Sequence, residues 1–249
     1  MHTKKIALVI LSLILMIRCS ENSDQKITVD VAQIDSLRVI KAANKYLPEQ
    51  PVTVTASQCD RSLGGIHDFY SEGDYWWPNP DDPDGPYIRR DGMTNPDNFK
   101  DHRRAMRRMS IQVAALAAAY KITGEKKYAD HAVEHLTAWF VDEETKMNPS
   151  MNYAQAIKGI CPGRGVGLID GIHLVEPARA VTVLENLNGI SEEDAAAIKA
   201  WYADFLTWMT THEYGIDERD RKNNHGTCWV MQAAEFARLT GNAEIMDYC

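Results

Sequence analysis

A histidine preceded by two asparagines is the segment of this sequence with the clearest chemical potential. Asn223, Asn224 and His225 stand just before an apolar run that begins at Cys228, so we expect them at the N-terminus of a helix. Unpaired backbone N–H groups and the helix dipole attract a carboxylate there, and they favour the neutral imidazole that a general base requires. An asparagine amide beside the imidazole could bind the same carboxylate. The structural alternative is that Asn223 or Asn224 caps the helix and His225 has no chemical role.

A cluster of aromatic residues lies in a segment rich in proline, glycine and aspartate. Tyr75, Trp76 and Trp77 fall within residues 74–80. Flat aromatic faces pack against the apolar faces of sugar rings while neighbouring polar groups bind the hydroxyls, so the cluster predicts a carbohydrate platform. The structural alternative is that one or both tryptophans fill the core beneath the loop.

A second polar, glycine-rich connection carries an arginine suited to binding an anion. Tyr153 and Gln155 lie in this connection, and Arg164 follows between two glycines. Glycines let the backbone approach a ligand closely, and a guanidinium can bind a carboxylate through two parallel hydrogen bonds. No strand is expected before this segment, so it does not match a dinucleotide-binding fingerprint. The structural alternative for Arg164 is a surface ion pair.

The residues His131, Glu134 and His135 match the H-x-x-E-H pattern of some zinc peptidases. On a helix this spacing places two histidines on one face, with a glutamate as base. No third ligand is evident nearby. We therefore expect no metal site here, and expect these side chains to form a solvated helix face.

Four arginines form a basic stripe on a predicted helix. They are Arg103, Arg104, Arg107 and Arg108. Such a stripe could help to attract a polyanion. We expect it instead to be a solvated face that balances acids elsewhere in the chain.

The elements that must position these residues are helices. Apolar periodicity predicts an amphipathic helix over residues 31–43 and further helices over residues 103–121, 126–140, 174–187, 195–211 and 227–239. Strand signals are nearly absent. The stretch from the end of the first helix to about Asp101 has no sustained periodicity, and we expect a long ordered loop there.

Helix-end signals suggest that these helices pair as hairpins. Thr-Gly pairs at 123–124 and 240–241 both close alanine-rich helices, and glycine suits the left-handed residue that ends a helix. Ser191 with Asp194 resembles a capping box, and Pro177 suits the first turn of its helix. Stacked hairpins make a solenoid or close into an α/α toroid. Because only residues 242–249 follow the second turn, we expect a C-terminal truncation.

Composition limits the partners of the chain. Its 249 residues, 45% hydrophobic and 25% charged, are enough for one large globular domain. Lysine and arginine total 27 against 35 acids, and the net charge of -8 provides no overall basic field for nucleic acid or an anionic membrane. An anionic ligand must therefore be bound by local groups.

The N-terminal residues are typical of an export signal. Lysines precede the apolar run 6–17, which is long enough for a signal-peptide core and short for a membrane span. Cys19 follows and leads into a polar stretch, an arrangement that resembles a lipoprotein cleavage site, although Arg18 departs from the small residue expected there. The alternatives are ordinary secretion and an uncleaved anchor. We expect a periplasmic or outer-membrane-anchored protein whose only membrane contact is a lipid on Cys19.

The remaining cysteines do not indicate a metal centre. They are Cys59, Cys161, Cys228 and Cys249. None forms a C-x-x-C pair or a zinc-like spacing. The sequence leaves a disulfide open.

Taken in order, five segments resemble the alginate lyase superfamily. They are residues 74–80, 147–149, 152–155, 163–165 and 223–227. The similarity spans roughly Gly64 to Gly241, and the pattern resembles that of the alginate and glucuronan lyases of gut-Bacteroides type. The resemblance implies an all-α fold, an incomplete α/α toroid, with no cofactor and no required metal. It also implies β-elimination across the 1,4 linkage of an anionic uronate polysaccharide.

The resemblance assigns roles to individual residues. Asn224 is expected to help neutralise the substrate carboxylate, and His225 to act at C5 as base or as carboxylate partner. This fits the chemistry, because a C5 proton beside an ionised carboxylate is removed only when that carboxylate is neutralised. Substrate contacts are expected from Trp76, Trp77, Tyr153, Gln155, Arg164 and Asn223.

The sequence departs from the family pattern beyond the Asn-His pair. By resemblance, the family's tyrosine acid and the arginine shortly before it are expected some tens of residues beyond the Asn-His pair, past residue 249, and Tyr248 does not stand in a matching motif. The segment 227–232 lacks the expected Trp-Tyr-Asp, so its subsite contacts are expected to differ. We divide the chain into a signal peptide (1–19), a polar linker (20–29) and a truncated lyase domain (30–249).

Two further functions stay open. The chain could hold a glycan without cleaving it, which would retain polysaccharide and give no unsaturated product. A toroid glycoside hydrolase would need two facing carboxylates, for which Asp74 and Asp170 are the candidates. The sequence does not distinguish mannuronate, guluronate and glucuronate, or endo from exo action.

Overall fold

The structure, a computed structural model, describes residues 31–249. The predicted signal peptide with Cys19 and the predicted linker 20–29 lie outside the described residues. The chain divides into two units, residues 1–35 and residues 36–249, and the second contains the site discussed below. Among the described helices, none is long and apolar enough to cross a membrane.

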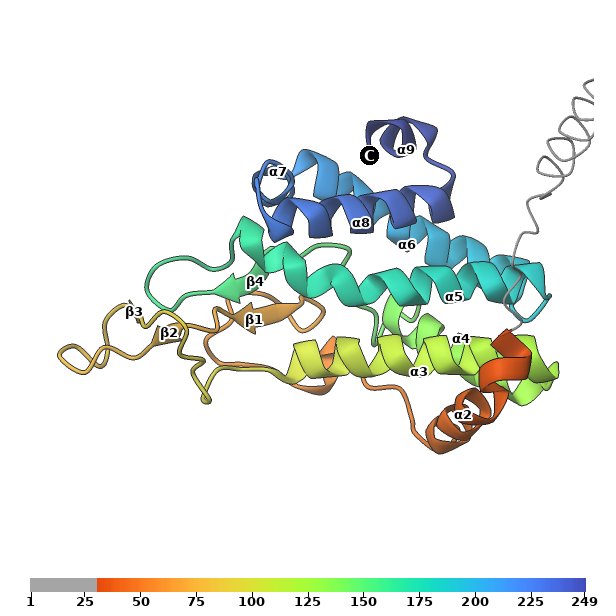
Figure 1. The fold of residues 1–249 in the computed structure, drawn as a ribbon. Helices are drawn as coiled ribbons and strands as arrows, with labels where there is room; N and C mark the ends of the chain where they lie inside the picture. The colour runs from red at the N-terminus through yellow and green to blue at the C-terminus, as the bar shows by residue number, and fades with distance from the viewer. Residues whose placement is uncertain (1–30) are drawn as a thin grey trace, which may run out of the picture. The chain divides into compact units, whose positions relative to one another are not determined.

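Helices dominate the described residues, which confirms the predicted all-α class (Figure 1). They are α2 (Val31–Tyr46), α3 (Asp101–Thr123), α4 (Lys126–Phe140), α5 (Val175–Asn186), α6 (Glu192–Thr211), α7 (Glu213–Arg219), α8 (Asn224–Thr240) and α9 (Ala243–Tyr248). Short 3-10 helices are η1 (Val54–Ala56) and η2 (Gly165–Leu174). The strands are β1 (Tyr70–Glu72), β2 (Trp76–Trp77), β3 (Ile88–Arg89) and β4 (Tyr153–Ala156).

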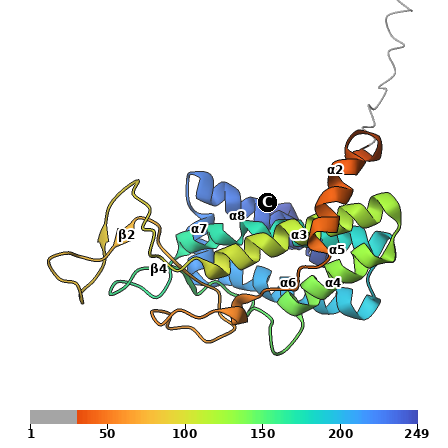
Figure 2. The ribbon, with the colours of Figure 1, turned by 90° about the horizontal axis from the view of Figure 1, so that it is seen from below.

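The helices of the second unit pack as hairpins in two layers. The helices α3 and α4 form one hairpin, and α5 and α6 form the next. Helix α5 packs between α3 and α8 in one layer, while α4 packs against α6 in the other (Figures 1 and 2). This arrangement is the predicted incomplete α/α toroid.

Large aromatic side chains fill the space between the helices and also hold the loops. Trp139, Trp201 and Trp229 are almost fully buried. Indole N–H groups must find acceptors when they are buried. Trp139 Nε1 donates to the carbonyl of Val52 at 3.0 Å, and Trp201 Nε1 donates to the carbonyl of Met147 at 2.6 Å. The helical core thereby fixes the start of both loop regions.

The predicted helix-end signals are confirmed. Ser191 Oγ accepts a hydrogen bond from the backbone N–H of Asp194 at 3.0 Å at the start of α6. Gly124 and Gly241 end α3 and α8 with φ of 69° and 71°, in the left-handed region. Pro177 lies in the first turn of α5.

The loop regions contain more regular structure than expected. Strand β1 pairs in parallel with β4, and β2 pairs in antiparallel fashion with β3. These strands are too short to show an alternating pattern in the sequence. Helix α7, with seven residues, was missed for the same reason, and η2 replaces part of the expected glycine-rich connection.

Replacement of Gly124 by alanine should destabilise the fold by about 1 kcal/mol, because alanine would have to adopt the left-handed backbone conformation of Gly124. Lack of space is not the cause, since nothing lies within 4 Å of a Cβ added at this position. Urea unfolding would measure the change. Gly65→Ala is the matched control, because Gly65 also has room for a Cβ and its φ lies outside the left-handed region. Equal stabilities of the two variants would contradict this explanation.

Candidate functional site

One arginine joins helix α3 to both loop regions. Arg103 Nε donates to Asp170 Oδ2 at 2.7 Å, and Nη1 donates to Asp74 Oδ1 at 2.6 Å. Its Nη2 donates to the carbonyl of Glu72 at 2.9 Å. The side chain of Arg103 is only 19% exposed, so our expectation of a solvated arginine face is wrong for this residue. Arg104, the next residue, is exposed as expected.

The same network fixes Gln155 in β4. Ser71 Oγ donates to Asp170 Oδ2 at 2.6 Å and accepts from the backbone N–H of Gln155 at 2.8 Å. Gln155 has a φ of 50°, a left-handed conformation that costs a residue with a side chain about 1–3 kcal/mol. Such strain persists only where surrounding contacts hold it, and it is concentrated at functional sites.

The residue that Gln155 holds in turn is Arg164. Arg164 Nε donates to the Gln155 carbonyl and Nη2 to Gln155 Oε1, each at 3.0 Å. Among the described residues, no carboxylate forms an ion pair with Arg164, so the expected alternative of a surface ion pair is not observed. Burial lowers the pKa of Arg164, and the positive charges of Arg89 and Arg103 lower it further, while Cys161 and Asp170 oppose this shift. A half-buried guanidinium in this setting would be stabilised by a bound anion.

Trp76 and Arg164 both pack against Gly73. A Cβ on Gly73 would come within 2.7 Å of Trp76 Cδ1 and 2.8 Å of Arg164 Nη2. Glycine at this position therefore lets the indole and the guanidinium approach the same stretch of backbone. Asn95 fixes the loop by donating from Nδ2 to the Trp76 carbonyl at 2.9 Å.

Trp77 has separate contacts within the first loop. Its Nε1 donates to the carbonyl of Met93 at 2.8 Å, and the Arg90 guanidinium lies 5.1 Å from its ring centroid. Trp76 and Trp77 are both half-buried, so neither is a fully buried core residue.

Tyr153 has a different environment from Gln155, although both belong to β4. A Cβ on Gly64 would come within 2.6 Å of the Tyr153 ring, and the ring packs against a small cluster that includes Cys59 and Tyr70. These contacts of Tyr153 stabilise the β1–β4 pair.

The Asn-His segment lies at the start of α8, as predicted. Asn223 Oδ1 accepts from the backbone N–H of His225 at 3.0 Å, so Asn223 caps the helix. Asn224 is the exposed first residue of α8. His225 Nδ1 lies 2.6 Å from Oε1 of Glu218, a fully buried carboxyl on α7. No pattern in the sequence indicated Glu218.

The Arg164 cluster and His225 lie on neighbouring elements. Both α7 and α8 pack against η2, which begins directly after Arg164. Gly165 lies against the side chain of Asp217, which precedes Glu218 on α7. Within the part of the chain that the structure describes, no hydrogen bond joins Arg164 directly to His225. The structure therefore gathers Trp76, Gln155 and Arg164, and places Asn224 and His225 on the adjoining helix.

The structure of residues 31–249 disfavours one alternative from the sequence and contradicts one expectation. Asp74 and Asp170 bind one guanidinium, so they do not face each other across space for a sugar, which argues against the glycoside hydrolase. His131 and His135 are buried and not solvated, with their Nε2 atoms 3.3 Å apart. Within residues 31–249 no group of three or more metal-binding side chains could hold an ion.

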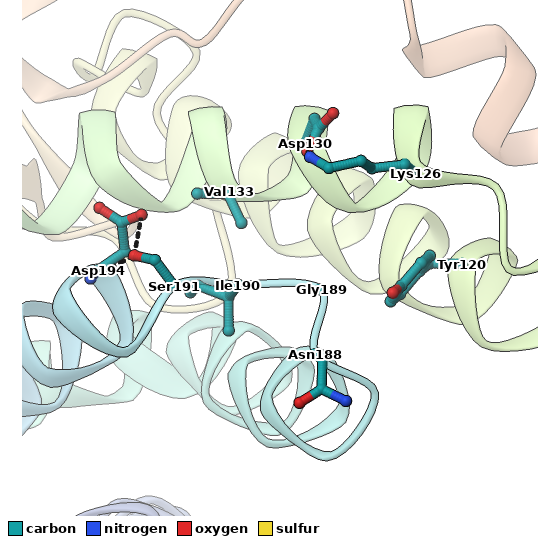
Figure 3. A pocket seen from close by; sticks show the side chains of 9 residues that line it. All are labelled: Tyr120, Lys126, Asp130, Val133, Asn188, Gly189, Ile190, Ser191 and Asp194. Atoms are coloured by element: carbon teal, nitrogen blue, oxygen red, sulfur yellow. Dashed lines mark hydrogen bonds and ion pairs between the residues drawn. The ribbon is translucent and has the colours of Figure 1, made fainter.

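A surface pocket of about 520 Å³ lies away from these residues (Figure 3). It is formed where the α3–α4 and α5–α6 turns meet, and Tyr120 on its wall is 17 positions after Arg103 on α3. At 1.5 Å per residue the two lie roughly 25 Å apart along the helix. Its charged residues are Lys126, Asp130 and Asp194, a balance unsuited to an anion.

Hairpins in two layers, with loop residues around a half-buried guanidinium, define an all-α toroid protein. The chain belongs to the alginate lyase family, because the family model described as alginate lyase matches residues 53–249. It is also similar to the crystal structure of an alginate lyase from Bacteroides ovatus at 1.60 Å resolution, with a TM-score of 0.80 and 35% identity. The match covers 88% of this chain and 60% of that chain. A comparison with curated proteins found no match.

Replacement of Arg103 by alanine should destabilise the protein by about 3 kcal/mol, because it leaves the carboxylate of Asp170, 10% exposed, without its partner. Arg104→Ala is the matched control. Its ion pair with Asp101 is exposed, so a loss below about 0.5 kcal/mol is expected. Chemical unfolding of the two variants would measure the difference, and equal losses would show that the network contributes little.

Proposed function

We propose that this protein is a polysaccharide lyase that cleaves 1,4-linked uronate polymers, alginate or glucuronan, by β-elimination. Membership of the alginate lyase family supports this. The observation that carries the proposal is the Arg164 guanidinium, half-buried beside Trp76 and paired with no described carboxylate. A uronate unit has a carboxylate that the Arg164 guanidinium can bind and an apolar ring face that can pack against Trp76.

In the proposed reaction, hydrogen-bond donors neutralise the substrate carboxylate so that charge can spread into it as the C5 proton leaves. Asn224 supplies such a donor, and Arg164 binds a carboxylate of the chain. His225 acts at C5, either taking the proton or holding the carboxylate. Elimination then forms the C4–C5 double bond, and a proton must reach the departing O4.

The structure alters the role that we propose for Asn223. Its Oδ1 is committed to the cap of α8, so its main contribution is to fix the backbone that carries Asn224 and His225. Trp77 and Tyr153 are proposed to shape the loops that border the site, while Trp76 and Gln155 contact the substrate.

The lyase activity should be visible as ultraviolet absorbance of the unsaturated uronate product when alginate or glucuronan is added. His225→Ala should abolish it, because the group acting at C5 is removed. A neutral glucan is the matched control substrate and should give no product. Failure of the unaltered chain to form unsaturated product from any polyuronate would count against the lyase proposal, and retention of polymer without product would favour glycan binding.

Binding of polyuronate should depend on Arg164. Arg164→Ala should weaken it by about 10-fold to 100-fold, the equivalent of one charge-assisted hydrogen bond. Arg179→Ala removes an exposed arginine on α5 and should leave affinity unchanged. Affinity electrophoresis in gels containing alginate would compare them. The same retardation in both variants would exclude Arg164 as a binding residue.

We also propose that the protein is exported, with Cys19 as a lipid attachment site. The support is the sequence pattern at residues 1–26 alone. Metabolic labelling with a radioactive fatty acid should mark the protein, and Cys19→Ala should remove the label. A labelled Cys19→Ala variant would contradict attachment at this residue.

A further inference from the structure

We propose that Glu218 is a positioning residue for His225, which holds the imidazole with Nδ1 protonated and presents Nε2 to the substrate. The proposal rests on the proposed action of His225 on a uronate. Neither family membership nor the Asn-His pattern assigns a role to Glu218.

The charge of Glu218 sets the direction of the hydrogen bond. An ionised carboxylate oxygen can only accept, so with Glu218 ionised the Nδ1 of His225, 2.6 Å from Glu218 Oε1, donates its proton to it. The Nε2 atom makes no hydrogen bond with any described residue and is not among the buried unpaired atoms. In the neutral ring Nε2 therefore carries the free lone pair.

The backbone holds the two side chains together. Glu218 lies on α7 and His225 in the first turn of α8, with the Asn223 cap between them. Gly226 lies against the carbonyl of Arg221, so the turn that joins the helices is closed too tightly for a side chain there. This packing leaves the imidazole little freedom to move away from Glu218.

The environment of Glu218 destabilises the fold, so stability does not explain why a carboxyl is buried there. Its side chain has no exposed surface, and its second oxygen, Oε2, is buried without a hydrogen-bond partner in the described chain. A buried carboxylate with one oxygen unsatisfied costs stability relative to an apolar side chain of similar shape. Such a group at a site is expected where it serves chemistry.

The chemistry that it serves is the charging of His225. If Nε2 takes the C5 proton, the C–H electron pair forms the C4–C5 double bond, the C4–O4 bond breaks with its electron pair going to O4, and O4 takes a proton from water. The imidazole is then a cation with its Nδ1 proton still held by Glu218, and the carboxylate stabilises that cation.

The raised pKa of Glu218 predicts how the free energy of unfolding depends on pH. Burial raises its pKa above the usual carboxyl range, opposed by the hydrogen bond and charge of His225 and by the charge of Arg221, while Asp217 adds to the rise. Between the ordinary carboxyl pKa and this raised value, the folded protein binds a proton that the unfolded chain has lost. The free energy of unfolding therefore falls as pH rises through that window.

Two substitutions separate the charge of Glu218 from its shape. Glu218→Gln keeps an acceptor but removes the charge, and Glu218→Met removes both. Glu213→Gln, an exposed change on the same helix, is the matched control. Urea unfolding would be measured at pH values between the ordinary carboxyl pKa and the raised pKa of Glu218. The free energy of unfolding should no longer decrease with pH in Glu218→Gln, whereas it should still decrease in Glu213→Gln.

Nitrogen-15 spectra of the imidazoles would read the tautomer of His225, assigned by its disappearance in His225→Ala. In the unaltered chain we expect the neutral ring to carry its proton on Nδ1, and in Glu218→Met we expect a mixture of tautomers. On polyuronate, Glu218→Gln should lower kcat by about 10-fold to 100-fold with little change in KM.

The outcomes are distinct. An unchanged tautomer in Glu218→Met, or unchanged kcat in Glu218→Gln, would overturn the positioning role even if the unaltered chain is an active lyase. If that chain forms no unsaturated product, the proposed function fails, and the tautomer still decides whether Glu218 orients His225. Should Glu218→Met not fold, the kcat and the pH dependence of Glu218→Gln decide.

Discussion

The arrangement of the site depends on the guanidinium of Arg103. It binds the carboxylates of Asp74 and Asp170 and the backbone carbonyl of Glu72, and so joins α3 to the first loop and to η2. A buried cation tolerates the loss of its partners poorly, because desolvation is compensated only while they are in place. This one group therefore contacts both loop regions, whose starts are also held by the indoles of Trp139 and Trp201.

The two arginines near the site have opposite electrostatic states. Arg103 is neutralised by two carboxylates, whereas Arg164 is held in position by the neutral groups of Gln155. Gln155 orients the guanidinium without cancelling its charge. A protein with a net charge of -8 can thereby present a local positive centre to a polyanion.

Periodicity and end signals predicted the helices well, because these features are local. Ser191, Gly124 and Gly241 behave as their sequence context indicates. The burial of Arg103 was not predictable in this way, because its partners lie 29 and 67 positions away in the chain.

The candidate site was predicted only in part. Resemblance to a family identified Trp76, Gln155 and Arg164, which the structure brings together. Glu218 could not be predicted from the sequence, because a helix of seven residues is too short to show a hydrophobic period. Its contact with His225 forms only when α7 packs beside α8. Polar contacts between separate elements require the packing that the sequence pattern does not contain.

The parallel pairing of β1 with β4 has a consequence for the order in which the protein folds. Tyr70 pairs with Tyr153 across a chain segment that includes all of α3 and α4. Closing so long a segment costs chain entropy, which is reduced once the two helices have formed their hairpin. We therefore expect the region around Gln155 to form after the helices and to open locally before they unfold. Amide protons there should exchange with solvent while those of the α3–α4 hairpin are still protected.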